Sequence, residues 1–155
     1  MPFKLRSPAF EKDGSIPDRF THKGANLSPP LKWHGAPTET KSFALVMEDP
    51  DAPRGVFHHW AVYDIPAETT ELPEGATGSG PSLRVAPNDY GNVGYDGPQA
   101  PERHDPHNPH NYHVRLAALD VAHLDVEPQD HAKAIWQTAQ PHIIAEAELV
   151  GTFGR

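Results

Sequence analysis

The hydrophobic residues of this chain are gathered in short runs that end at proline, glycine or acidic residues. The runs at residues 43–47 and 59–63 show little alternation, which predicts central strands covered on both faces. Residues 112–119 begin with alternating polarity and then become wholly apolar, which predicts a third long strand. A buried helix does not fit the first run, because the run is short and Asp49-Pro50 follows it closely.

Weaker patterns predict the remaining elements. Residues 2–20 are interrupted by prolines and a glycine, so we expect short edge strands there, with further short strands at 31–34 and 83–85. The long stretch 66–92 is otherwise rich in turn residues and predicts an ordered loop region of the kind that often carries function. Helical spacing predicts one helix over 129–138, Pro141 can open a second through Ala147, and a last strand follows at 148–153.

The order of these elements predicts a mainly β protein, an antiparallel β-sandwich with two short helices near the C-terminus. Its 155 residues favour a single domain, 1–155. The 18 prolines and 12 glycines agree with many turns and short strands.

Composition excludes several classes of function. With no cysteine there is no disulfide, no cysteine-ligated zinc finger and no thiol nucleophile. We find no signal peptide and no run long enough to cross a membrane, so we expect a soluble, cytoplasmic protein. A formal net charge of −8 argues against nucleic-acid binding and requires any anion site to be built locally.

The richest chemistry lies at residues 48–60, between the two predicted central strands. Asp49 ends the first strand and His59 begins the second, so both side chains can reach one small pocket at the sheet rim. For Asp51 we favour ordinary turn chemistry, in which the carboxylate caps backbone N–H groups. His58 and His59 point in opposite directions in a strand, so only one of them can face the pocket.

Residues 90–98 form a glycine-rich segment, with Gly91, Gly94 and Gly97 three residues apart. It matches neither a Walker loop nor a dinucleotide fingerprint. Backbone N–H groups exposed to an anion and an ordinary turn are both compatible with this spacing.

Residues 103–113 contain His104, His107, His110 and His113 at intervals of three, with prolines between them. A metal site is one interpretation. Polyproline geometry, however, places such neighbours roughly 9 Å apart, too far to share one ion. We therefore favour a solvated loop whose His110 turns inward with Tyr112.

Acid–base chemistry by Asp49 with His59 or His110 is a further hypothesis. No nucleophile elbow, metalloprotease helix or cysteine nucleophile accompanies these residues, so enzymatic activity is disfavoured.

Taken together, the motifs resemble the phosphatidylethanolamine-binding protein family, in its bacterial and archaeal Raf-kinase-inhibitor-like branch, over nearly the whole chain. They are Ser28-Pro-Pro-Leu31, Lys41-Ser-Phe-Ala-Leu45, Asp49-Pro-Asp-Ala-Pro53, His59-Trp60, Asn88-Asp-Tyr-Gly91, Gly94-Tyr-Asp-Gly-Pro98, His110-x-Tyr112 and the ending Ala145–Phe153.

This resemblance implies a β-sandwich with a small anion pocket for phosphate-like groups, such as phospholipid headgroups or phosphorylated residues, and requires no cofactor or resident metal. Carried over by motif, the ligand-binding residues are Asp49, Ala52, Pro53, Phe57, His59, Gly97, Pro98, His110 and Tyr112. The resemblance also implies a cis peptide bond before Pro53 and a homodimer. A regulatory, kinase-inhibitor-like role is a hypothesis, since fold and pocket do not fix a protein partner.

The sequence departs from the family pattern at three places. Phe57 stands where eukaryotic relatives often have Trp, and Asn111 replaces a basic residue. The segment 99–109 is longer and richer in histidine than usual. Because the carboxylate of Asp49 would favour charged histidines, we expect anion affinity to weaken as pH rises through the histidine range.

Overall fold

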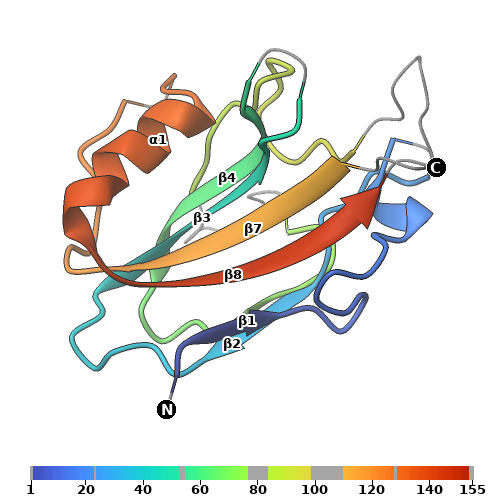
Figure 1. Cartoon of the computed structure of the whole chain (residues 1–155). Helices are drawn as coiled ribbons and strands as arrows, with labels where there is room; N and C mark the ends of the chain where they lie inside the picture. The colour runs from blue at the N-terminus through green and yellow to red at the C-terminus, as the bar shows by residue number, and fades with distance from the viewer. Residues whose placement is uncertain are drawn as a thin grey trace.

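The computed structural model describes residues 2–22, 24–52, 55–76, 84–98, 110–127 and 129–153. Within these residues the chain forms two antiparallel sheets (Figure 1). The smaller has the order β1-β2-β5, with β1 at Lys4–Arg6, β2 at Leu31–His34 and β5 at Glu71–Leu72. The larger has the order β6-β4-β3-β7-β8, with β6 at Arg84–Val85, β4 at Phe57–Pro66, β3 at Ser42–Asp49, β7 at His110–Leu119 and β8 at Ile143–Phe153.

The central strand is β3, as its unbroken apolar run predicts. It pairs with β4 on one side and with β7 on the other, and all but one of its residues are buried. The short strands expected at 31–34 and at 83–85 are also present, the second as Arg84–Val85.

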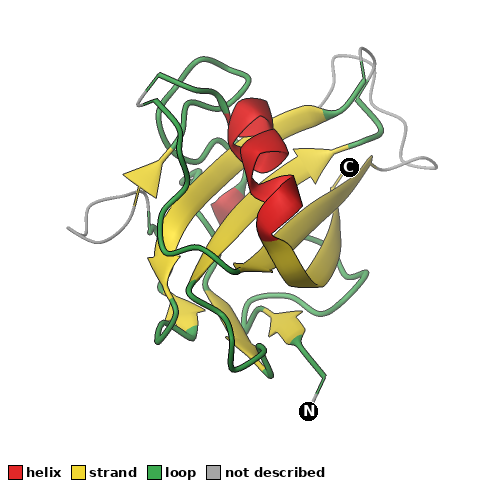
Figure 2. Cartoon of the chain, turned by 90° about the vertical axis from the view of Figure 1, so that its left-hand side faces the viewer, coloured by secondary structure: helices red, strands yellow, loops and turns green. Residues whose placement is uncertain are grey.

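Apolar side chains fill two layers, one on each face of the larger sheet. The first lies between the two sheets and includes Phe43, Trp60 and Leu116. The second lies beneath helix α1 (Ala132–Ala139), where Ile135 and Trp136 pack on the other face (Figure 2). A sheet covered on both faces explains why its central strands are wholly apolar. No helix in the described ranges is long and apolar enough to span a membrane.

The second predicted helix, from Pro141 through Ala147, is wrong. Pro141 lies in a single 3-10 turn, Gln140–His142, and the chain then enters β8 at once. From Ala145 to Phe153 the inward side chains of β8 alternate with outward ones, among them Glu146 and Glu148. Pairing along the whole of β7 stabilises this strand, and a local helical pattern does not reveal such long-range pairing. A second 3-10 turn, Asp18–Phe20, precedes the first long loop.

We expect Ile135→Ala to lower the free energy of unfolding by about 2–5 kcal/mol, because this side chain is fully buried between helix and sheet. Ile144→Ala is the matched control, since Ile144 is 40% exposed on β8 and should change stability by less than about 1 kcal/mol. Urea denaturation of both variants measures the difference. Equal effects would contradict the assigned position of the helix.

Candidate functional site

The end of β3 and the beginnings of β4 and β7 meet at one edge of the larger sheet. Register pairs Asp49 with Phe57, and pairs His110 of β7 with Phe153 of β8. Here His110 Nδ1 lies 2.7 Å from Asp49 Oδ2. The Asp49 side chain is only 6% exposed, whereas that of His110 is 25% exposed. Because a carboxylate accepts, Nδ1 of His110 donates and its Nε2 atom is left for another partner.

His59 lies beside this pair and is held by a backbone group. Its Nδ1 atom is 2.8 Å from the carbonyl oxygen of Asp96, so Nδ1 carries the proton. Burial lowers the pKa of the His59 imidazole, and this effect exceeds the opposing influence of the Asp96 carbonyl and the Asp49 carboxylate. His59 is therefore neutral near pH 7.

Aromatic rings surround His59. The ring centres of Phe57, Tyr90 and Tyr112 lie 4.9, 5.8 and 5.3 Å from that of His59. Burial raises the pKa of Tyr90 to about 12, and it raises the pKa of Tyr112 as well, with a smaller contribution from Asp49. Both phenols therefore keep their protons and can act as hydrogen-bond donors.

The carboxylate of Asp96 organises the loop behind the site. The side-chain amides of Asn26, Asn88 and Asn92 donate to it at 3.0, 2.8 and 2.9 Å. Burial alone would raise the pKa of the Asp96 carboxyl, but these three hydrogen bonds outweigh it and hold the pKa below its usual range. His22 adds a fourth neighbour, with its Nε2 atom 3.8 Å from Asp96 Oδ1.

The structure shows why residue 97 is a glycine. A Cβ atom there would lie 2.0 Å from the carbonyl oxygen of Phe20, so the loop packs directly on the 3-10 turn at 18–20. The Gly97 N–H donates to Asn26 Oδ1 at 2.7 Å, and the carbonyl of Pro98 accepts from the N–H of His22 at 3.0 Å. Loop packing therefore uses the backbone groups that the sequence suggested for an anion.

The turn after β3 is closed by its own carboxylates. Asp49 Oδ1 accepts from the N–H of Asp51, and Asp51 Oδ2 accepts from the N–H of Asn111, both at 2.9 Å. Ala52 is half-buried and its carbonyl accepts from Gly55. Pro53 and the cis bond expected before it lie outside the described residues.

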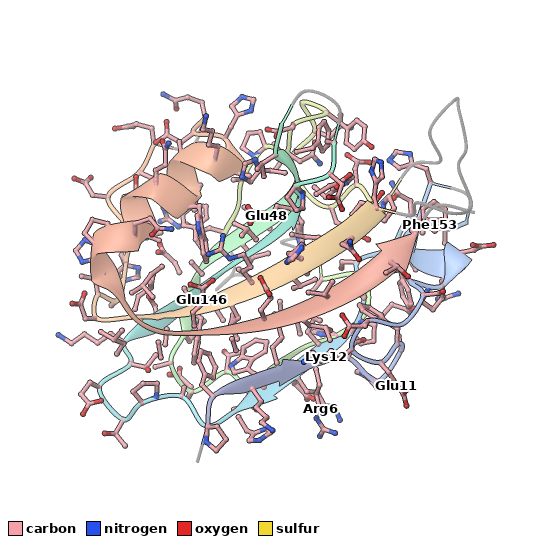
Figure 3. The ribbon with its side chains drawn as sticks, in the orientation of Figure 1. Arg6, Glu11, Lys12, Glu48, Glu146 and Phe153 are labelled. Atoms are coloured by element: carbon pink, nitrogen blue, oxygen red, sulfur yellow. The ribbon has the colours of Figure 1, made fainter. Side chains whose placement is uncertain are left out.

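The predicted opposition of His58 and His59 is confirmed, because His58 takes part in a separate ionic cluster. His58 Nδ1 lies 3.1 Å from Asp89, and His58 Nε2 lies 3.5 Å from Glu48. Arg115 bridges Glu48 and Glu146 at 2.9 and 2.7 Å (Figure 3). These five residues, which we call the outer ionic cluster, interact at a distance from the Asp49–His110 pair.

The histidine-rich segment enters the structure only at its end. His104 and His107 lie outside the described residues, whereas His110 joins Asp49 and His113 points away, 3.1 Å from Glu148. Among the residues that can be placed, no cluster of histidines and carboxylates could hold a metal ion.

Sequence reasoning missed four residues that shape the site: His22, Asn26, Tyr90 and Asp96. The last two lie within the motifs at 88–91 and 94–98, so those motifs were a usable signal. His22 and Asn26 lie in a polar loop whose pattern indicated nothing beyond a loop. Contacts across about seventy positions in the chain brought them to the site.

Three comparisons agree on the relatives of this chain. A family model described as phosphatidylethanolamine-binding protein matches residues 6–154. A UPF0098 protein of Methanothermobacter thermautotrophicus is 41% identical over 154 residues, which cover 97% of this chain and 98% of that protein. The crystal structure of CT736 from Chlamydia trachomatis, a putative PEBP homolog, superposes with a TM-score of 0.86 at 33% identity, covering 99% and 98% of the two chains.

Escherichia coli YbcL, described as a new member of the mammalian PEBP family, superposes with a TM-score of 0.91 at 28% identity. The match covers 100% of this chain and 99% of YbcL.

We expect Asp96→Asn to destabilise the protein at pH 7 by about 1–3 kcal/mol, because an amide cannot accept all three hydrogen bonds. The lowered pKa means that the carboxylate stabilises the fold above its unfolded pKa, and that this contribution is lost as pH falls through the folded value. The gap between wild type and variant should therefore narrow below about pH 4. Denaturation at several pH values measures it, with the exposed Asp125→Asn as control. A gap that does not depend on pH would contradict this role.

Proposed function

The chain belongs to the phosphatidylethanolamine-binding protein family, and on that premise we propose that it binds a small phosphate-like anion beside Asp49, His59 and His110. The observation that carries the proposal is the Asp49–His110 contact of 2.7 Å, with His59 and Tyr112 next to it. Members of this family are named for a phospholipid ligand, and a phosphate group is the part of that ligand that histidine and tyrosine donors recognise.

The donors of such a site are side chains. In its protonated form His110 presents Nε2–H to a ligand while Nδ1–H stays on Asp49, and Tyr112 presents its hydroxyl. Asp49 thus orients a donor and does not oppose the anion directly. The overall charge of −8 supplies no attraction, so recognition depends on these local donors.

The remaining ligand residues from the family motif are proposed in supporting positions. Phe57 forms a wall against His59, while Gly97 and Pro98 fix the loop that carries the Asp96 carbonyl. Ala52 and Pro53 belong to the turn that Asp49 closes.

A hydrolase is the second candidate, because the Asp49–His110 contact also has the geometry of an acid–base pair. No serine or threonine is hydrogen-bonded to these histidines in the described ranges, so a water molecule would have to attack. Turnover of a phosphoester or acyl ester, abolished by His110→Ala, would establish it. Metal binding through residues 104–113, a regulatory partner, a homodimer and a cytoplasmic location stay predictions.

We expect inorganic phosphate to bind the wild-type protein and to lose affinity as pH rises from about 5.5 to 8.5, by up to about tenfold per unit. The reason is that a histidine donor loses its proton across this range. Isothermal calorimetry at constant ionic strength measures the affinity. His110→Ala should weaken binding at least about tenfold, since a charged hydrogen bond contributes about 1.5–3 kcal/mol.

His142→Ala is the matched control, because this histidine pairs with Asp120 at the opposite end of the sheet. It should leave phosphate affinity unchanged. Affinity that is independent of pH, or equal loss in both variants, would refute the proposed site.

A further inference from the structure

We propose that this site selects anions by their proton: it accepts a phosphate that still carries an acidic P–OH group and discriminates against sulfate of the same shape and charge. The inference rests on the proposed anion site and names the form of the ligand that the site takes. It follows from the orientation of one buried histidine and from the hydrogen bonds that surround it.

The fixed tautomer of His59 makes its second nitrogen an acceptor. Nδ1–H donates to the Asp96 carbonyl at 2.8 Å, so the neutral ring has a lone pair on Nε2. None of the described residues is hydrogen-bonded to Nε2. The sealed polar side-chain atoms that lack a partner in the described part of the chain do not include it, so Nε2 keeps some contact with solvent; they are Ser28 Oγ, Trp33 Nε1, Thr40 Oγ1, Trp60 Nε1 and Trp136 Nε1.

The groups around His59 do not supply the missing proton. Asp49 and Asp89 carry charges that favour an imidazolium, and the Asp96 carbonyl acts in the same direction, whereas His22 opposes it. Burial outweighs the favourable terms and lowers the pKa of His59. The nearest rings, Phe57, Tyr90 and Tyr112, are uncharged because both phenols keep their protons.

The neighbouring acceptors are already occupied. Asp49 accepts from Asp51 N–H through Oδ1 and from His110 through Oδ2, and Asp96 accepts from three asparagine amides. His59 Nε2 is therefore the open acceptor among these buried groups. An anion that binds against it must donate a hydrogen bond there, or its oxygen lone pairs meet the lone pair of the ring.

Hydrogen phosphate and sulfate are a matched pair for this contact. Both are tetrahedral dianions at about pH 8, but only hydrogen phosphate has a proton to donate. An unpaired acceptor in a buried site costs about 1–3 kcal/mol, which corresponds to roughly 5- to 150-fold in affinity. The site should therefore prefer phosphate by at least about tenfold.

Calorimetric titration of the wild-type protein with sodium phosphate and with sodium sulfate, at about pH 8 and equal ionic strength, tests the inference. We expect phosphate to bind at least about tenfold more tightly. On lowering the pH to about 5 the preference should shrink, because His59 then gains a proton and becomes a donor.

His59→Gln gives a second reading, since its amide can present an N–H₂ donor where the imidazole presents a lone pair. In this variant sulfate should gain on phosphate and the ratio of affinities should approach one. His142→Gln, at the far end of the sheet, should keep the wild-type ratio.

The outcomes separate the two levels of the proposal. If phosphate and sulfate bind the wild-type protein equally well at about pH 8, the selection by proton is overturned and the anion site stands. If neither anion binds at any pH, the proposed function fails and the selection fails with it. A preference for phosphate that His59→Gln leaves intact would also overturn the assignment to His59.

Discussion

The buried carboxylate of Asp96 is the interaction on which the arrangement of the site depends. A charge with so little exposure is tolerated because three asparagine amides surround it, and those amides come from two loops far apart in the chain. Its satisfaction fixes the 88–98 loop against the 18–28 loop. That loop in turn aims the Asp96 carbonyl at His59, so the same residue stabilises the loops with its side chain and sets the histidine tautomer with its backbone.

Strand geometry divides the chemistry between two faces. Glu48 and His58 belong to the outer ionic cluster, whereas their immediate neighbours Asp49 and His59 belong to the candidate site. Asp89, between Asn88 and Tyr90, also joins the outer cluster, and it is bonded to the backbone of His58 in both directions. The ionic cluster thus holds together the strand and the loop from which the site is built.

Much of this structure was predictable from the sequence because the signals were local. The apolar runs of β3, β4 and β7 indicated central strands, and the motif around Asp49 indicated a site at their ends. The helix predicted through Ala147 failed because pairing with β7 decides the conformation of that segment. The parts played by His22 and Asn26 were not predictable, because loop contacts between distant residues create them.

The division between the two faces limits how this protein can change in length. Deleting or inserting one residue early in β4 would reverse the directions of His58 and His59, placing one beside Asp49 and the other beside Glu48. The new inward histidine would no longer hold its proton on the Asp96 carbonyl. Substitutions can therefore adjust the two faces separately, whereas a shift in length at this point changes both together.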